Sequence, residues 1–195
     1  MQLSREVIVA EAMLILDEFG LGDLTMRRLA KQLDVVPGAL YWHVPNKQSL
    51  LEAIAESIVA PVLDLGAERG VDTPWQHATH QIARTLRDAM VAHRDGADVV
   101  SAALPVGDLR TRIIDALCEP LSGADLDDAA RRLAGNTVLD FVMGYTVSEQ
   151  ATTQLAQVTG GCDHPGAGNH AERNQRFDAG LSIVLAGVSS LTQLR

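Results

Sequence analysis

The amino-acid sequence predicts an all-α protein, with a small N-terminal helical module followed by a larger helical body. Apolar residues recur at helical spacing through most of the 195 residues, and no segment alternates in the way of a half-buried strand. Clusters of glycine and proline divide the chain into segments of helical length. With 47% hydrophobic residues, a chain of this size can bury an adequate core without disulfides.

The first predicted helix covers residues 5–19 and ends at Gly20-Leu21-Gly22. Its apolar stripe consists of Val7, Ile8, Leu14, Ile15 and Phe19. This helix would support the segment that follows it.

The segment from Leu24 to Lys47 predicts two short helices joined by a sharp turn. Thr25 is a suitable N-cap for the first of them. One side of this helix is apolar and the other is basic, through Leu29, Ala30 and Leu33 against Arg27, Arg28 and Lys31. Pro37 can open the second helix and Pro45 stops it, after about two turns. The pattern is helix, turn, helix.

A second helix this short is typical of a DNA-binding headpiece. Its N-terminal turn enters the major groove, and donors on either side hold the phosphates. Suitable donors are Tyr41, Trp42, His43 and Lys47. The alternative is a packed corner of a helical bundle, with Tyr41 and Trp42 as ordinary half-buried aromatic residues.

The larger body should begin with a helix capped by Asn46, which Pro61 bends or breaks near its end. Thr73-Pro74 starts a fifth helix that runs to about His93. The next segments are an apolar piece resembling a pocket wall (97–104), two helices (108–120 and about 126–155), a glycine-rich mobile connector (159–169) and a last helix (171–194). The last helix is apolar around most of its circumference, which indicates burial at a subunit interface.

The charge distribution fits a specific DNA-binding protein even though the net charge is −9. Residues 1–60 carry five basic against eight acidic side chains, whereas residues 24–47 alone carry four basic against one acidic. The basic footprint is local, which suits a specific binder better than a non-specific coat.

Several other classes of protein are disfavoured by the sequence. No apolar run reaches the roughly 18 residues of a membrane span, and the N-terminus lacks an export signal, so we expect a cytoplasmic protein. Cys118 and Cys162 lie far apart without metal-ligand spacing and are expected to be free thiols. We expect no cofactor and no metal.

Three motifs identify a family. The chain closely resembles the tetracycline-repressor (TetR) family in the motifs LTMRRLAKQL, LYWHVPNKQSLL and MVAHRDGADVV. The segment GYTVSEQ adds to the resemblance, which covers both the N-terminal module and the larger helical body. The resemblance implies a helix-turn-helix DNA-binding domain over residues 1–46 and an effector-binding and dimerisation domain over residues 47–195. It further implies a homodimer, joined by a four-helix interface, that binds successive major grooves of a palindromic double-stranded operator.

The resemblance also assigns DNA contacts to this chain. They are Thr25, Met26, Arg27, Pro37, Gly38, Ala39, Tyr41, Trp42, His43 and Lys47. Arg27 is the best candidate to read a base, whereas Ala39 offers only a methyl contact, for instance to thymine. The operator should differ from that of the family's namesake, which has hydrogen-bonding side chains where this chain has Val36 to Ala39.

The predicted ligand pocket departs further from the namesake. Positions that hold polar drug contacts and metal-linked ligands there match almost entirely apolar residues here, so we expect no response to a magnesium–tetracycline chelate. The predicted pocket residues are Leu63, Ile82, Leu86, Val100, Ala103, Leu104, Pro105, Ala116, Leu117, Asn136, Thr137, Asp140, Tyr145 and Ser148. We expect a small lipophilic effector with few polar anchors.

The leading interpretation is therefore a repressor, not an enzyme, that a lipophilic effector releases from its operator. The alternative is a small-molecule carrier or enzyme that uses the apolar cavity, with the headpiece as an interaction module. Activation instead of repression, and a regulator without a natural effector, stay open. His77 with His80 and the His93-Arg94-Asp95 motif are better explained as structural than as metal-binding or catalytic. Asp140 has three alternatives: a solvated face, an interface pair or a pocket anchor.

Overall fold

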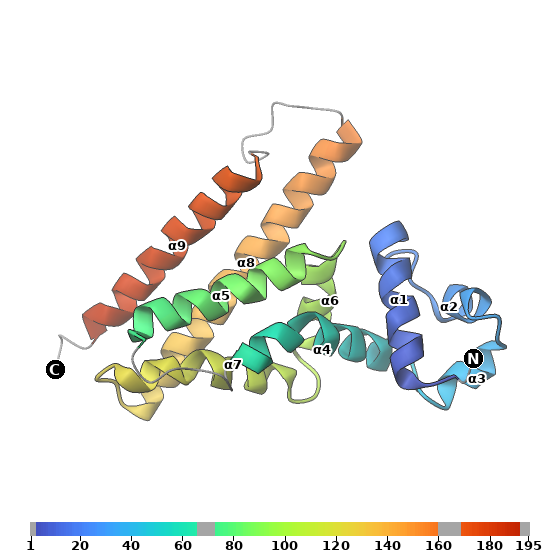
Figure 1. Cartoon of the computed structure of the whole chain (residues 1–195), viewed down its shortest axis with the longest axis horizontal. Coiled ribbons are helices and arrows are strands. Elements are labelled where there is room, and N and C mark those ends of the chain that lie inside the picture. Colours follow the sequence, from blue (N-terminus) through green and yellow to red (C-terminus); the bar gives the residue numbers. More distant parts are fainter. Residues whose placement is uncertain (1–2, 66–72, 160–168, 192–195) are drawn as a thin grey trace. The chain divides into compact units, whose positions relative to one another are not determined.

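The computed structural model describes residues 3–65, 73–159 and 169–191, and every regular element within these ranges is helical. The elements are α1 (Arg5–Phe19), α2 (Met26–Gln32), α3 (Pro37–Tyr41), α4 (Lys47–Leu65), α5 (Trp75–Val91), α6 (Gly96–Ala103), α7 (Leu109–Cys118), the short 3-10 helix η1 (Pro120–Gly123), α8 (Asp128–Thr159) and α9 (His170–Leu191) (Figure 1). The predicted all-α class is confirmed.

The chain forms two compact units. The first contains Met1–Ala60 and Ala89–Leu109, and the second contains Pro61–Asp88 and Arg110–Arg195. The first unit thus combines α1, α2, α3 and most of α4 with α6. The second contains most of α5 together with α7, α8 and α9.

Helix α1 packs on a stripe that differs from the predicted one. Its buried residues include Ile8, Ala12, Ile15 and Leu16, whereas Leu14 is exposed. The sequence pattern was ambiguous because Leu14, Ile15 and Leu16 are consecutive and only two of them can face the core. The Ser4 hydroxyl accepts a hydrogen bond from the Val7 amide at 3.3 Å and caps the helix.

The predicted helix-turn-helix is confirmed. The Thr25 hydroxyl accepts a hydrogen bond from the Arg28 amide at 3.1 Å and begins α2. The chain then reverses through Asp34, whose φ of +53° is in the left-handed region, and the Val35 amide donates to the Ala30 carbonyl at 2.9 Å. Pro37 occupies the first turn of α3.

Helix α4 starts where the sequence predicts but continues past its proline. Asn46 accepts a hydrogen bond from the Ser49 amide at 2.9 Å, which confirms it as the cap. The helix extends through Pro61 to Leu65, so the proline does not break it. Pro61 has no amide hydrogen for the Ser57 carbonyl, and the Ser57 hydroxyl turns back to the Ala53 carbonyl at 3.1 Å.

Residues 97–104, for which the sequence predicted only a short apolar segment, lie almost entirely within helix α6. It follows a tight reversal in which Asp95 has a φ of +55°. A Cβ on Gly96 would lie 2.3 Å from the Met90 carbonyl oxygen, so only glycine fits where the end of α5 meets the start of α6.

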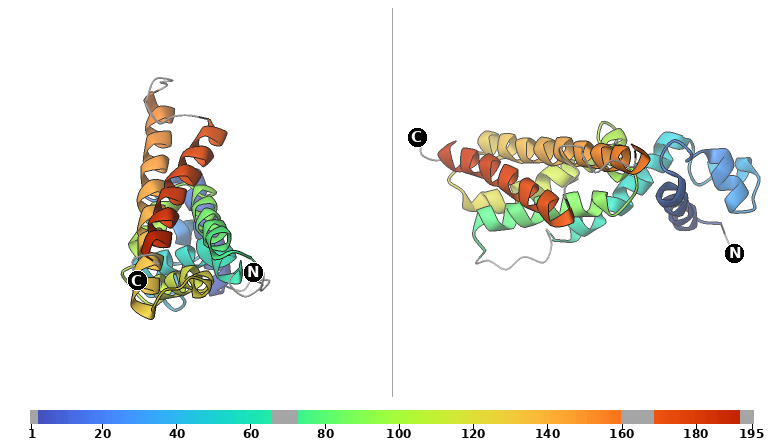
Figure 2. Two further views of the ribbon diagram at one scale, coloured as in Figure 1. Left: turned by 90° about the vertical axis from the view of Figure 1, so that its left-hand side faces the viewer. Right: turned by 90° about the horizontal axis from the view of Figure 1, so that it is seen from above.

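Helices α8 and α9 lie side by side in the second unit (Figure 2). Phe141, Tyr145 and Phe177 form an aromatic cluster between them, with ring centroids 5.3–5.9 Å apart. Helix α8 begins at Asp128 and is capped by Asp127, which accepts from the Ala130 amide at 2.8 Å. Before α8, Ser122 lies in η1, where its hydroxyl donates to the Glu119 carbonyl.

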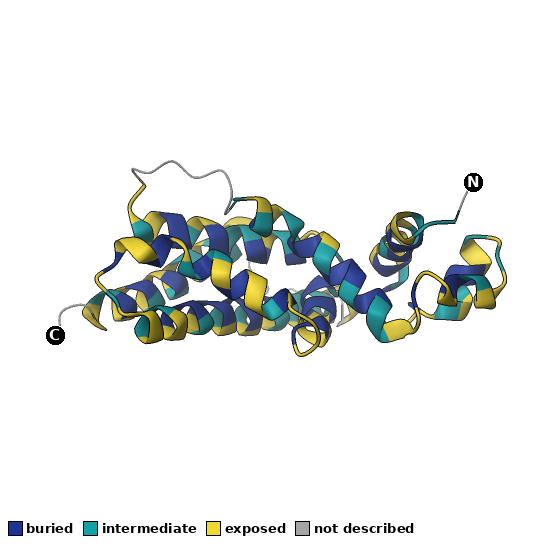
Figure 3. Ribbon diagram, turned by 90° about the horizontal axis from the view of Figure 1, so that it is seen from below, coloured by how far each residue is buried: buried dark blue, intermediate teal, exposed yellow. Residues whose placement is uncertain are grey.

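Along the helices, stretches of buried residues alternate with stretches of exposed ones, as expected where one side of a helix packs and the other meets water (Figure 3). Most of the predicted mobile connector, including Cys162, lies outside the described residues, as do residues 192–195. None of the described helices is long and apolar enough to cross a membrane.

Candidate nucleic-acid interface and ligand pocket

The helix-turn-helix presents its predicted DNA contacts to solvent. Trp42 is 90% exposed, a state in which a large aromatic side chain contributes almost nothing to the fold. Thr25, Arg27, Pro37, Gly38, Tyr41, His43 and Lys47 are also exposed, and Met26 and Ala39 are half-buried. The packed-corner alternative required Tyr41 and Trp42 to be semi-buried, and their exposure contradicts it.

The two adjacent arginines of α2 have different roles. The Arg28 guanidinium donates to Asp23 at 2.7 Å, and its carbon lies 3.6 Å from the centre of the Phe19 ring. No hydrogen bond or ion pair holds the Arg27 side chain within the described part of the chain. Arg28 therefore fastens α2 to the end of α1, and Arg27 stays available to a ligand.

Basic side chains line a hollow beside α2. It has a volume of about 490 Å³ and is lined by Gly22, Asp23, Thr25, Arg27, Arg28, Lys31 and Gln32. Lys47 stands at the first position of α4, where helical amide groups and the lysine charge both favour an anion. This chemistry suits phosphate groups.

The His93-Arg94-Asp95 motif is structural, as predicted. Its polar groups hold the end of α1: His93 Nδ1 lies 3.1 Å from Asp17, and Arg94 donates to the Glu18 carbonyl at 3.1 Å. Asp95 accepts from the Leu21 amide at 2.6 Å. We call these contacts the α1 clasp.

The clasp also explains Gly20. This residue has a φ of +83°, and a Cβ there would lie 2.8 Å from Asp95 Oδ2. A side chain at Gly20 would therefore both strain the backbone and displace the carboxylate of the clasp.

The residues predicted to line an effector pocket fall in both units. Those of the first unit are Val100, Ala103, Leu104 and Pro105. The remainder belong to the second unit. The aliphatic members Ile82, Leu86, Val100, Ala103, Leu104 and Leu117 are buried; Leu63, Ala116, Asn136 and Tyr145 are half-buried; Pro105, Thr137, Asp140 and Ser148 are exposed.

Three polar members of this set, Tyr145, Thr137 and Asp140, already have partners in the chain. The Tyr145 hydroxyl donates to the Arg173 carbonyl at 3.1 Å, and burial raises the pKa of Tyr145, with the Glu149 charge adding to it. The Thr137 hydroxyl donates to the Leu133 carbonyl at 2.9 Å. Asp140 pairs with Arg110 at 3.1 Å and is largely solvated.

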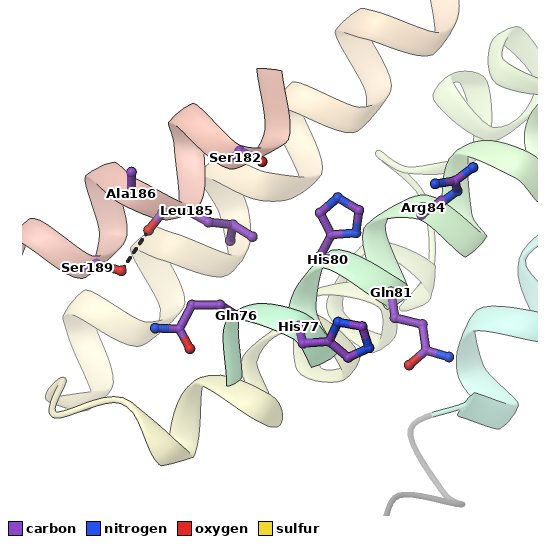
Figure 4. Close-up of a pocket in the computed structure, with 9 residues that line it drawn as sticks. All are labelled: Gln76, His77, His80, Gln81, Arg84, Ser182, Leu185, Ala186 and Ser189. Carbon is purple, nitrogen blue, oxygen red and sulfur yellow. Dashed lines mark hydrogen bonds between the residues drawn. The ribbon is translucent and has the colours of Figure 1, made fainter. Parts of the chain in front are cut away.

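A further hollow lies in the second unit, and of its lining residues the sequence analysis singled out only His77 and His80. The α5–α9 groove has a volume of about 660 Å³ and is lined by Gln76, His77, His80, Gln81, Arg84, Ser182, Leu185, Ala186 and Ser189 (Figure 4). His80 lies 3.3 Å and Arg84 2.9 Å from Asp178 of α9. Within the described residues, no group of three or more histidine, cysteine or acidic side chains could hold a metal ion.

A buried ion pair joins α5 to α8. Arg87, with no exposed surface, donates to both carboxylate oxygens of Glu149, at 2.5 and 2.8 Å, and also to Asn174 at 2.8 Å. Burial alone would lower the pKa of Arg87, but the hydrogen bonds and charge of Glu149 outweigh it and raise the pKa. Sequence reasoning missed this pair because its members lie 62 positions apart.

Family models match both parts of the chain. The model of bacterial regulatory proteins of the tetR family matches residues 8–54, and the model of the tetracycline-repressor-like C-terminal domain matches residues 69–160. The class A tetracycline repressor of transposon 1721 from Escherichia coli is 31% identical, over 96% of this chain and 91% of its own. The chain belongs to the tetR family of bacterial regulatory proteins.

Solved structures are similar to this TetR-family chain over nearly its whole length. BioQ of Mycobacterium smegmatis is 38% identical and superposes with a TM-score of 0.82, over 97% of this chain and 99% of that one. A structure of BioQ with its natural double-stranded DNA operator is also similar, with 38% identity and a TM-score of 0.76 over 96% and 99% of the two chains. This TetR-family chain is thus a DNA-binding transcriptional regulator, and the family consists of regulators and not of enzymes.

Proposed function

We propose that this TetR-family regulator is a cytoplasmic, homodimeric repressor that binds a palindromic operator and is released by a small lipophilic effector. The observation that carries the proposal is the headpiece surface, where Trp42 is 90% exposed and Arg27 has no partner in the described chain. Exposed aromatic and unpaired basic side chains on a helix-turn-helix suit phosphates and base edges. In this proposal, residues 1–46 bind DNA, and residues 47–195 bind the effector and the second subunit.

The dimer follows from the outer sides of α8 and α9. Large apolar side chains are exposed there, including Leu133 and Val158 on α8 and Ile183 on α9. Val158 is 86% and Ile183 75% exposed, which is unfavourable in water and is relieved when a second copy covers them. Two headpieces held together in this way would bind half-sites about one helical turn apart.

The effector would occupy a pocket lined by the predicted apolar residues of the second unit, such as Ile82, Leu86 and Leu117, and act through the headpieces. Its aliphatic lining offers burial of apolar surface but few hydrogen bonds, which favours a lipophilic molecule over a metal chelate. Such a molecule releases DNA only to the extent that it prefers the conformation that does not bind the operator. We therefore expect release without magnesium, and no magnesium-dependent binding of tetracycline in calorimetry.

A selection experiment tests the function. Sites bound by the full-length protein are selected from random DNA and compared with the DNA upstream of its own gene in a retardation assay with excess competitor. A palindromic site bound by two chains is expected. The carrier or enzyme alternative predicts no competitor-resistant binding, and that result would sink the proposed function.

A further inference from the structure

The start of α3, the second helix of the helix-turn-helix, exposes an aliphatic surface. Val36, the N-cap residue of α3, is 71% exposed, and the residues after it are an exposed proline, an exposed glycine and a half-buried alanine. No side chain from Val36 to Ala39 carries a hydrogen-bonding group. The Val36 side chain makes no capping hydrogen bond, so the turn does not need a valine for its own geometry.

This surface limits what α3 can read on a base pair. In the major groove, guanine, cytosine and adenine are distinguished through donors and acceptors, which an aliphatic side chain cannot engage. The feature that it can recognise is the C5 methyl group of a pyrimidine, normally that of thymine. Exposure of a branched aliphatic residue is unfavourable in the free protein, and contact with a methyl group relieves it.

We propose that Val36 reads the C5 methyl group of one thymine in each half-site, an inference that rests on the proposed function. Val36 has two terminal methyl groups at the exposed start of α3, whereas Gly38 has no side chain and Ala39 is smaller and less exposed. Arg27 on α2 would supply the hydrogen-bonded part of the readout and Val36 the apolar part.

The size of the effect follows from the area of one methyl group. Burial of a methyl group against an aliphatic partner changes affinity about fourfold per half-site, and roughly 15-fold when both half-sites are changed together. A change of this size is resolved by a titration in which parent and altered operators are compared at one salt concentration.

A uracil scan of the selected operator tests the inference. Each thymine is replaced in turn by deoxyuridine, which removes only the methyl group, and affinities are measured for the full-length parent, for Val36→Ala and for Ala39→Gly. The parent is expected to lose about fourfold at one position per half-site. Val36→Ala should bind the unmodified operator more weakly and be insensitive at that position. Ala39→Gly, which removes a different predicted methyl contact and can itself weaken binding, should keep the sensitivity at that position. Unchanged melting temperatures exclude an effect of folding.

A methylated-cytosine arm separates the methyl group from the rest of the thymine. At the sensitive position, 5-methylcytosine paired with guanine should bind the parent more tightly than cytosine does, and Val36→Ala should not distinguish the two. The inference is overturned if operator binding is specific but no methyl effect depends on Val36. If the parent binds no operator in excess of competitor, the proposed function and this inference fall together.

Discussion

Two arginines, one in each unit, are used in opposite ways. In the headpiece, Arg27 is exposed and has no partner in the described chain, although its neighbour Arg28 is fixed by Asp23 and Phe19. In the second unit, Arg87 is wholly buried and bound to Glu149 and Asn174. A charge kept in water is free for a ligand, whereas a charge withdrawn from water becomes part of the fold and is costly to leave unpaired. Exposure and partners, more than residue type, thus distinguish binding from structural roles.

The largest expected effect is on the buried pair. Glu149→Gln leaves the buried Arg87 with only the half-exposed Asp88 as a counter-charge and should lower the free energy of unfolding by about 3–5 kcal/mol in urea titrations. Arg84→Gln is the matched control, because the ion pair of Arg84 with Asp178 is half-exposed and should contribute less than about 1 kcal/mol. Equal losses for the two variants would contradict the comparison. Arg87→Met combined with Glu149→Leu should recover much of the stability.

The next effect separates the adjacent arginines. Arg27→Ala should cost about 1–3 kcal/mol of operator affinity and relax specificity at one base pair, with little change in melting temperature. Arg28→Ala should instead lower the melting temperature, since it removes the contacts with Asp23 and Phe19. Retardation assays on single-base operator variants, together with calorimetric melting, measure both. The reverse assignment would show that Arg27 is the structural residue.

A smaller effect is expected at Lys47. Lys47→Ala should weaken binding to all sequences alike and reduce the slope of log affinity against log salt by about one per subunit. Titrations of operator and unrelated DNA at several salt concentrations would reveal it. A loss confined to the operator would instead assign Lys47 to base readout.

The smallest effect concerns a single carboxylate of α6. Partial burial, reinforced by the charge of Asp95, raises the pKa of Asp98. The folded state therefore holds this proton more tightly than the unfolded chain, and the ionised group destabilises the fold at neutral pH. Asp98→Asn should be slightly more stable than the parent at neutral pH. This gain should fade as the pH falls through the range in which carboxylates are protonated; a gain that grows toward acid pH would have the wrong sign.

Local signals in the sequence predicted most of the helices, because caps and turns depend on near neighbours. Thr25, Asn46 and Pro37 each act within four residues of their position. The helical form of α6 was not predicted, because it follows a tight glycine turn whose partners lie in α1, more than 70 positions away. The buried Arg87–Glu149 pair was missed for the same reason. Exposure at Val36 was likewise invisible, since a valine beside a proline fits a core position equally well in sequence.

The α1 clasp has a consequence for building hybrid regulators. A headpiece transplanted at the boundary after Ala60 would leave behind the segment Ala89–Leu109, which belongs to the same unit and carries Arg94 and Asp95. The donor's version of Asp17 and Gly20 would then meet the recipient's clasp. Exchange of operator specificity between relatives therefore requires the transfer of both segments, with three junctions in the chain rather than one, or donors selected to have the same acidic residue and glycine at the end of α1.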